Sequence, residues 1–243
     1  MIRREIGSEF WDVPVSKQIN MLFPESTQWF LSGRSALTAI IRDIKKNRGA
    51  HTVSMPSWCC DSMIIPFVRE GIEVKFYPVY LANDGLKQEI DKSHDVLFLM
   101  DFFGYSAPTP DLTGYNGVVI RDVTHSIFSA GYSDADYYFG SLRKWCGVKT
   151  GGYMWGAELE PGVVDDVFIS LRKEAMNEKR MYIEGQKDSK DFLRVYEEAE
   201  EYLDEHDGVF ASTDEDVENA EYLDVEKIRT QRRKNTRVLM EAF

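Results

Sequence analysis

The sequence has few cysteines and no long apolar run, and both absences narrow the class of protein. Its three cysteines, Cys59, Cys60 and Cys146, form neither an even disulfide framework nor a two-by-two metal spacing. The adjacent pair is best interpreted as small buried hydrophobic residues, and we predict no metal site. No stretch is as long as the apolar segment of a signal peptide or of a membrane span. We therefore expect a cytoplasmic protein.

Positive charge is also scarce. The chain has 29 Lys and Arg against 41 Asp and Glu, a net charge of -12. This balance argues against nucleic acid as the main partner, because binding to phosphate backbones needs a basic surface. The acidic residues are concentrated in the last third, where the run 197–205 is typical of the solvated face of a helix. With 243 residues, 43% of them hydrophobic, the chain can form the core of one or two domains.

The order of apolar segments predicts an α/β fold. After an irregular stretch over 1–30, helical patterns at 36–44 and 57–71 alternate with strand patterns at 52–56, 72–77, 95–100 and 118–122. Such alternation indicates a mostly parallel sheet covered by helices. Further strands are predicted at 136–140 and 153–156, followed by charged amphipathic helices over 163–185, 189–206 and 214 to the end.

The stretch 137–152 contains the residue we select for chemistry. Lys144 stands between a predicted strand end and a glycine pair, where rigid scaffold meets loop. Upstream, a buried strand ends at Asp122, three residues before His125, and open α/β sheets bind ligands at the carboxyl ends of their strands. Pyridoxal phosphate (PLP) needs a lysine for its Schiff base and a carboxylate on its pyridinium nitrogen. The pair predicts this cofactor, against the alternative of a solvated lysine and a structural histidine.

These elements resemble the DegT/DnrJ/EryC1/StrS sugar aminotransferases, which are fold type I PLP enzymes. The resemblance is carried by Asp122 to His125, by Ser141-Leu142-Arg143-Lys144, by Gly151-Gly152 and, in support, by the segment 32–37. It implies a three-layer α/β/α large domain with a mostly parallel sheet. It also implies Lys144 as the Schiff-base lysine and Asp122 as the partner of the ring nitrogen. Lys149 ranks lower, because Lys144 has the family's offset from Gly151.

The resemblance implies roles for further cofactor-binding residues. Trp58 matches an aromatic that stacks on the pyridine ring, and His125 matches a residue that contacts the phenolic oxygen or orients the ring. The family holds the cofactor phosphate at the residues that correspond to Gly33, Arg34 and Ser35, and Ser141 is a further phosphate contact. From the residues alone, Trp58 also fits a core aromatic and 32–35 a plain helix N-terminus. Arg34 replaces the usual threonine and either contacts phosphate or substrate or points elsewhere.

Two departures from the family pattern limit what the resemblance implies. The family's Asn-Tyr-Arg-Met-like element after the glycine pair is missing, and the chain ends at Phe243, where family members continue into a small C-terminal domain. We therefore expect an N-terminal arm over 1–30, a PLP-binding large domain over 31–205, and a helical linker over 206–243 towards a C-terminal domain that is short or absent. Asp101, which follows a predicted buried strand, either faces the pocket or caps the next element.

By resemblance the protein is a homodimeric aminotransferase that moves an amino group from an amino acid such as glutamate to a nucleotide-linked keto sugar. Two alternatives remain open. One is a truncated, non-catalytic PLP-binding or interaction module. The other is a fold type I enzyme that runs another reaction, such as an elimination or a decarboxylation, from the same lysine and aspartate.

Overall fold

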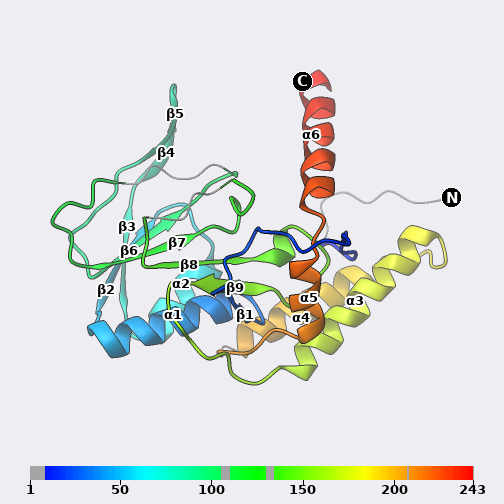
Figure 1. Ribbon diagram of the computed structural model, residues 1–243, viewed down its shortest axis with the longest axis horizontal. Coiled ribbons are helices and arrows are strands. Elements are labelled where there is room, and N and C mark those ends of the chain that lie inside the picture. Colours follow the sequence, from blue (N-terminus) through cyan, green and yellow to red (C-terminus); the bar gives the residue numbers. More distant parts are fainter. Residues whose placement is uncertain (1–8, 105–109, 130–133, 207, 243) are drawn as a thin grey trace.

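A seven-stranded sheet forms the centre of the computed structural model, which describes residues 9–104, 110–129, 134–206 and 208–242 (Figure 1). In spatial order its strands are β1 (Gln28–Phe30), β9 (Gly152–Trp155), β8 (Tyr137–Ser141), β7 (Val118–Asp122), β6 (Val96–Met100), β2 (Thr52–Pro56) and β3 (Glu73–Tyr77). All neighbours from β8 to β3 pair in parallel, and β9 alone runs antiparallel to both of its neighbours. The predicted mostly parallel α/β sheet is confirmed.

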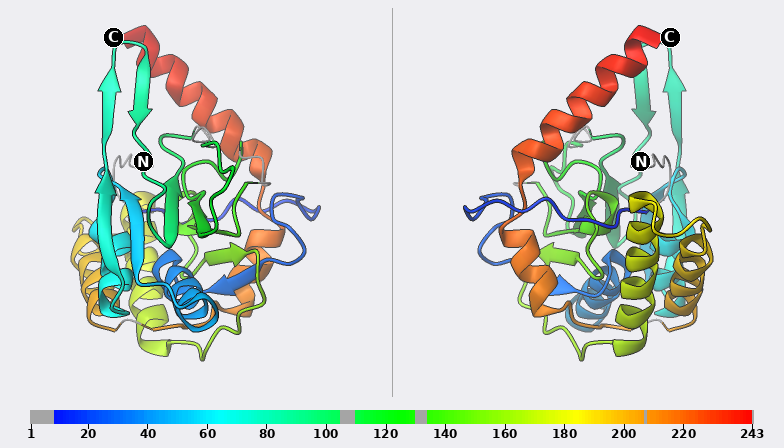
Figure 2. Two further views of the ribbon diagram at one scale, coloured as in Figure 1. Left: turned by 90° about the vertical axis from the view of Figure 1, so that its left-hand side faces the viewer. Right: turned by 90° about the vertical axis from the view of Figure 1, so that its right-hand side faces the viewer.

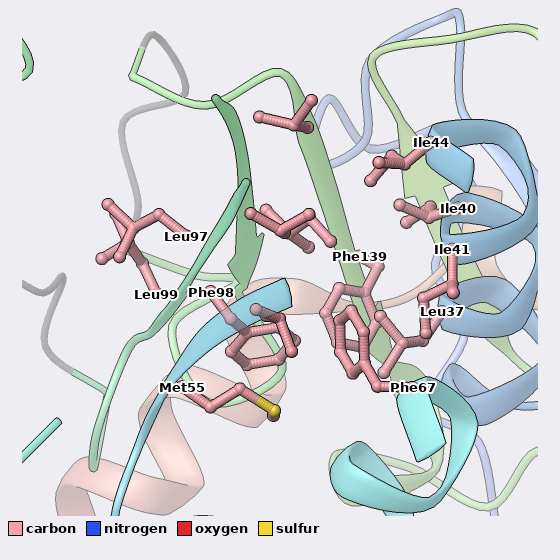
Figure 3. Packing of buried hydrophobic residues seen from close by; sticks show 14 of the residues in the cluster. Leu37, Ile40, Ile41, Ile44, Met55, Phe67, Leu97, Phe98, Leu99 and Phe139 are labelled. Carbon is pink, nitrogen blue, oxygen red and sulfur yellow. The ribbon is translucent and has the colours of Figure 1, made fainter. Parts of the chain in front are cut away.

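Helices α1 (Gly33–Arg48) and α2 (Asp61–Arg69) cover one face of this sheet. α1 begins at Ser32, whose hydroxyl accepts a hydrogen bond from the Ser35 amide, and ends at Gly49 in the left-handed region. Four fully buried side chains form its apolar stripe, namely Leu37, Ile40, Ile41 and Ile44 (Figure 3). Burial of each contributes about 1.5–3 kcal/mol. The stripe therefore fixes the position of the helix N-terminus at the edge of the sheet.

The other face is covered by α5 (Asp214–Glu221), by the start of α6 (Val225–Ala242) and by segments without helix or strand. Tyr138, Tyr153 and Trp155 of β8 and β9 pack there against Ala220 of α5 and Ile228 of α6. These sheet residues alternate with the ones that face α1, as strand geometry requires. The expected three layers are present, with helices in the outer layer at the β8–β9 end. Arg229 of α6 also donates to the Phe128 carbonyl and Arg232 lies over the ring of Trp145, and beyond them α6 projects away from the body (Figure 1).

A helical pair, α3 (Asp166–Glu184) and α4 (Phe192–Glu205), packs beside the β1 end of the sheet (Figure 2). Phe168 of α3 and Ala199 and Leu203 of α4 enclose Leu31, the residue between β1 and the cap of α1. This packing brings the carboxyl half of α4 next to the N-terminus of α1. A chain segment more than 160 residues later in the sequence thereby reaches the same edge of the sheet.

Several predicted elements need correction. The helix predicted over 57–71 begins only at Asp61, because the backbone of Cys60 is extended (φ -93°, ψ 158°), so that Trp58 lies in a loop. The helix predicted from 214 to the end is two helices, since the Asp224 amide leaves the helical pattern to bond the Pro14 carbonyl. The edge strand β1 and the hairpin of β4 (Val79–Ala82) and β5 (Gly85–Gln88) were not predicted. The division of the chain at residues 30 and 205 stays a prediction.

Within the described ranges, no helix combines the length and the apolar composition that crossing a bilayer requires.

Candidate active site

A cavity of about 570 Å³ lies at the carboxyl edge of the parallel strands. All predicted site residues except Ser35 line it, namely Gly33, Arg34, Trp58, Asp122, His125, Ser141 and Lys144. They come from the ends of β2, β7 and β8 and from the start of α1. The sheet therefore brings together residues that are up to about 110 positions apart in the sequence, at the edge where such sheets bind ligands.

Lys144 presents a free amine to this cavity. It ends η1 (Leu142–Lys144), a single 3-10 turn after β8, and its side chain is exposed. The turn is fixed from beneath, because Leu142 is fully buried and its amide donates to the Gly151 carbonyl at 2.7 Å. Within the described part of the chain, the Lys144 ammonium makes no hydrogen bond or ion pair. The structure thus combines a fixed backbone with an accessible amine.

The glycine pair after Lys144 has a steric reason. Gly151 has a φ of +117°, a conformation that L-residues rarely adopt. At Gly152 an added Cβ would lie 2.0 Å from the carbonyl oxygen of Ser32. Only glycine lets β9 pass this closely beneath the start of α1. The pair therefore holds the loop of Lys144 against the helix N-terminus.

Lys149, the competing lysine, is committed elsewhere. It is 8% exposed, and its Nζ lies 2.7 Å from Glu215 Oε2 and 3.7 Å from Asp216 Oδ1. It does not line the cavity. Of the two lysines weighed from the sequence, Lys144 is the one whose amine is available to a ligand.

Asp122 ends β7 with a carboxylate that is only half satisfied. Its Oδ1 accepts a hydrogen bond from the Thr124 amide at 2.8 Å, whereas its Oδ2 is buried and has no hydrogen-bond partner among the described residues. Burial raises the pKa of Asp122, and the hydrogen bonds from Thr124 and the nearby His125 oppose this only in part. An unpartnered buried oxygen is costly. A cationic N–H donor in the cavity would satisfy it and favour the ionised form.

Further polar atoms of cavity-lining residues lack partners among the described residues. His125 Nδ1 and Ser141 Oγ are buried, and neither has a hydrogen-bond partner among the described residues. Both residues line the same cavity as Asp122. Buried polar groups in folded proteins are nearly always hydrogen-bonded. Nε of Arg34 and Nε of Arg143 are also buried without a partner among the described residues, so five such atoms belong to residues around this cavity. They indicate a site built for a polar ligand.

The N-terminus of α1 points into the cavity beside Ser141. Gly33 lies so close to β8 that an added Cβ would sit 3.3 Å from the Gly140 oxygen and 3.3 Å from Ser141 Cβ. The first amides of a helix have no intrahelical acceptor, so those of Gly33 and Arg34 can bind an anion. The amide of Ser35 is already capped by Ser32 Oγ at 3.1 Å, and Ser35 does not line the cavity. Its predicted phosphate contact stays a prediction.

Arg34 points towards α4. Its Nη2 lies 2.6 Å from Asp204 Oδ1, and its Nη1 donates to the Leu203 carbonyl at 3.1 Å. The side chain therefore contacts α4, and its predicted contact with phosphate or substrate stays a prediction. The guanidinium ties the N-terminus of α1 to the C-terminus of α4, where cations are favourable.

Trp58 lines the cavity from the loop between β2 and α2. It is 41% exposed, and its ring meets Phe102 edge to face at 6.5 Å. A core aromatic would be fully enclosed. The partly exposed indole instead offers a flat apolar surface to the cavity that Asp122 and Ser141 also line.

Two charged clusters were not predicted from the sequence. Asp101 does not line the cavity but pairs with Arg121, and Glu200 of α4 lines it in an ion pair with Arg143. An arginine within the apolar strand 118–122 was a usable signal, since a buried guanidinium requires an acidic partner. Glu200 had no local signal, because the acidic run 197–205 resembles any solvated helix face.

The comparisons with known proteins show partial structural likeness only. No protein-family model matches the chain, and no curated protein matches it.

Within the described part of the chain, no group of three or more His, Cys, Asp and Glu residues could hold a metal ion.

Solved structures similar to this chain include sugar aminotransferases, the class that the sequence resembles. Helicobacter pylori PseC, an aminotransferase involved in the biosynthesis of pseudoaminic acid, has a TM-score of 0.44 and 14% identity over 70% of this chain and 55% of its own. Sugar aminotransferase CalS13 from Micromonospora echinospora has a TM-score of 0.41 and 14% identity over 61% and 44%. A sphingosine-1-phosphate lyase from Burkholderia pseudomallei has a TM-score of 0.41 and 14% identity over 53% of this chain and 37% of its own.

This chain spans 33% to 55% of the length of these and similar structures. At these values the likeness establishes neither a family nor an activity for the chain.

Proposed function

We propose that this protein is a PLP-dependent aminotransferase of fold type I. The observation that carries the proposal is the buried, unpartnered Oδ2 of Asp122 in the same cavity as the unpaired amine of Lys144. A protonated pyridine nitrogen is the donor that this oxygen lacks. When bound, PLP supplies an electron sink for the bonds at the substrate's amino-bearing carbon.

Lys144 is the catalytic group of this proposal. Its Nζ would hold the cofactor covalently and, once displaced by the amine of the substrate, would move a proton to and from the substrate's amino-bearing carbon. The exposed position of the side chain leaves it free for both tasks. The buried turn beneath it keeps the backbone still while Nζ moves.

The other cavity residues bind and orient the cofactor. The carboxylate of Asp122 favours a cationic nitrogen, which in turn favours the ionised carboxylate. The indole of Trp58 limits the tilt of a flat ring, and His125 Nδ1 is free to bond an oxygen at the ring edge. The amides of Gly33 and Arg34 together with Ser141 Oγ form an anion site that fits a phosphate.

The finer parts of the proposal rest on the sequence resemblance. They are an amino donor such as glutamate, a keto-sugar acceptor, a cytoplasmic location and a homodimer. The geometry of the cavity supports the cofactor and the lysine.

The test is to incubate the purified protein with PLP, reduce it with borohydride and map the modified peptide by mass spectrometry. We expect the adduct on Lys144 in the wild type and in Lys149→Ala, and none in Lys144→Ala. Loss of the visible absorbance on addition of glutamate then shows the first half of transamination. An adduct found only on Lys149 or on other surface lysines contradicts the proposal.

A further inference from the structure

Arg143 stands directly before Lys144 and lines the same cavity. It is 8% exposed, and Phe168 of α3 lies 5.4 Å from its guanidinium carbon, a cation–π contact that holds the group in place. Nη1 donates to Glu200 Oε1 at 2.5 Å. Nε is buried and has no hydrogen-bond partner among the described residues. The guanidinium therefore keeps an unused donor next to the catalytic amine.

Glu200 is the carboxylate that occupies Arg143. It extends from α4 into the cavity with 42% of its side chain exposed, and Nη1 of Arg172 lies 3.8 Å from the same oxygen. Burial raises the pKa of Glu200, but three nearby cations more than offset this effect. The Arg143 guanidinium, then the Arg172 guanidinium and the Lys144 ammonium bring the pKa below its usual range. Glu200 is thus ionised at neutral pH, as the carboxylate of an amino acid is.

We infer that Arg143 recognises the carboxylate of the amino donor and that Glu200 occupies this place until the donor binds. The inference rests on the proposed function. An α-amino acid carries its carboxylate one carbon away from the amine, so a donor whose amine replaces Lys144 Nζ brings a carboxylate to the neighbourhood of Arg143. A guanidinium binds carboxylates through two parallel donors. Arg143 can offer Nε together with an Nη group.

The surroundings favour this assignment over the other cavity-lining arginine. Arg34 also has a buried Nε with no partner among the described residues, but both of its Nη groups bind α4, through Asp204 and the Leu203 carbonyl. Glu200 binds Nη1 of Arg143. Glu200 can release Arg143, because it is partly exposed and keeps Arg172 as a second cation nearby. The exchange replaces one carboxylate by another and leaves no charge unpaired. Because a carboxylate is needed to displace Glu200 from Arg143, the exchange also favours amino donors with a carboxylate over simple amines.

The first test measures binding of glutarate, a dicarboxylate without an amine, by titration calorimetry on the full chain with and without PLP. We expect Arg143→Gln to weaken binding by about 10-fold or more, the loss of charged hydrogen bonds. We expect Glu200→Gln to tighten binding several-fold, because the internal competitor is removed. Arg42→Gln and Glu70→Gln alter an ion pair of similar length, 2.7 Å, outside the cavity and serve as matched controls without effect.

The second test compares donors on the PLP-loaded protein. L-Alanine and isopropylamine differ in that a methyl group replaces the carboxylate. We expect the wild type to prefer alanine in the half-reaction, Arg143→Gln to lose this preference, and Arg143→Lys to regain part of it. Thermal unfolding of each variant shows whether it is folded.

The outcomes separate the two proposals. If PLP forms no adduct on Lys144, the proposed function fails. The glutarate titration without PLP still tests whether Arg143 binds a carboxylate. If the adduct forms but Arg143→Gln keeps both glutarate affinity and the preference for alanine, the inference alone is overturned. Weaker glutarate binding in Glu200→Gln also overturns it, since the Arg143–Glu200 pair would then be a structural tie between η1 and α4.

Discussion

The guanidinium of Arg121 and the carboxylate of Asp101 form a buried ion pair, with Nη1 2.7 Å from Oδ1. Their side chains are 2% and 0% exposed. Ser126 donates to the other oxygen of Asp101 at 2.5 Å, and Nη2 of Arg121 reaches Asp134 at 2.5 Å. Because Arg121 precedes Asp122 on β7, the guanidinium lies on the opposite side of the strand from the Asp122 carboxylate. It ties the ends of β6 and β7 together behind the site.

Replacing Asp101 by Ala should destabilise the protein by about 3 kcal/mol, near the low end for breaking a buried pair, because Asp134 still compensates Arg121. The free energy of unfolding, measured in urea, checks this. Arg42→Gln, which breaks the more exposed pair with Glu70, should cost only about 0–1 kcal/mol. Equal costs for the two variants would contradict the role given to burial.

The approach of Gly152 to Ser32 gives a second prediction. Gly152→Ala places a methyl group 2.0 Å from the Ser32 carbonyl oxygen, so β9 and the start of α1 must separate. We expect a loss of several kcal/mol, on the order of the largest single-mutant effects, together with weaker PLP binding. The control is Gly49→Ala, which has a φ of +61° but no atom within 4 Å. It should cost about 1 kcal/mol and leave PLP binding unchanged.

Local patterns sufficed to predict the parallel strands and the ends at which Asp122 and Lys144 lie. Strand periodicity is encoded in a few neighbouring residues, and parallel strands put their carboxyl ends at one edge. The hairpin β4–β5 was missed because its residues, from Val79 to Gln88, alternate weakly and most of them are only half-buried. The break between α5 and α6 was missed because its cause is Pro14, some 200 residues away.

The candidate site divides in the same way. Trp58 and His125 follow strand ends and Ser141 ends β8, so all three were accessible from the sequence. The ion pair of Arg143 with Glu200 depends on how α4 packs beside α1, which no local pattern encodes. The direction of Arg34 was left open for the same reason, since its partners lie on α4.

Trp58→Ala should lower PLP affinity about 2- to 10-fold, because loss of a stacking contact costs about 0.5–1.5 kcal/mol. Trp58→Phe keeps a flat ring and should retain most of the affinity. Since the indole is 41% exposed, both variants should unfold within about 1 kcal/mol of the wild type when PLP is absent. Fluorescence titration with PLP and urea unfolding measure the two quantities. An alanine variant that loses stability but not affinity would identify Trp58 as a core residue.

Asp122→Asn should stabilise the PLP-free protein at neutral pH. Burial raises the pKa of Asp122 in the folded state, whereas the unfolded value is about 4. Below about pH 4 the carboxyl is protonated in both states and contributes no penalty. As the pH rises towards the folded pKa, the unfolded state releases its proton first, so the wild type loses stability, by up to about 1.4 kcal/mol per pH unit. Asn does not titrate and escapes this loss.

Urea unfolding at several values between pH 4 and 8 should therefore show the variant gaining on the wild type as the pH rises. Added PLP should reverse the order at neutral pH, because its protonated nitrogen compensates the carboxylate of Asp122 and stabilises only the wild type in this way. Parallel stability curves for the two proteins in the absence of PLP would show that the buried Oδ2 carries no cost. Pairing Asp122 Oδ2 with the cofactor nitrogen would then relieve no burial cost and would not strengthen PLP binding.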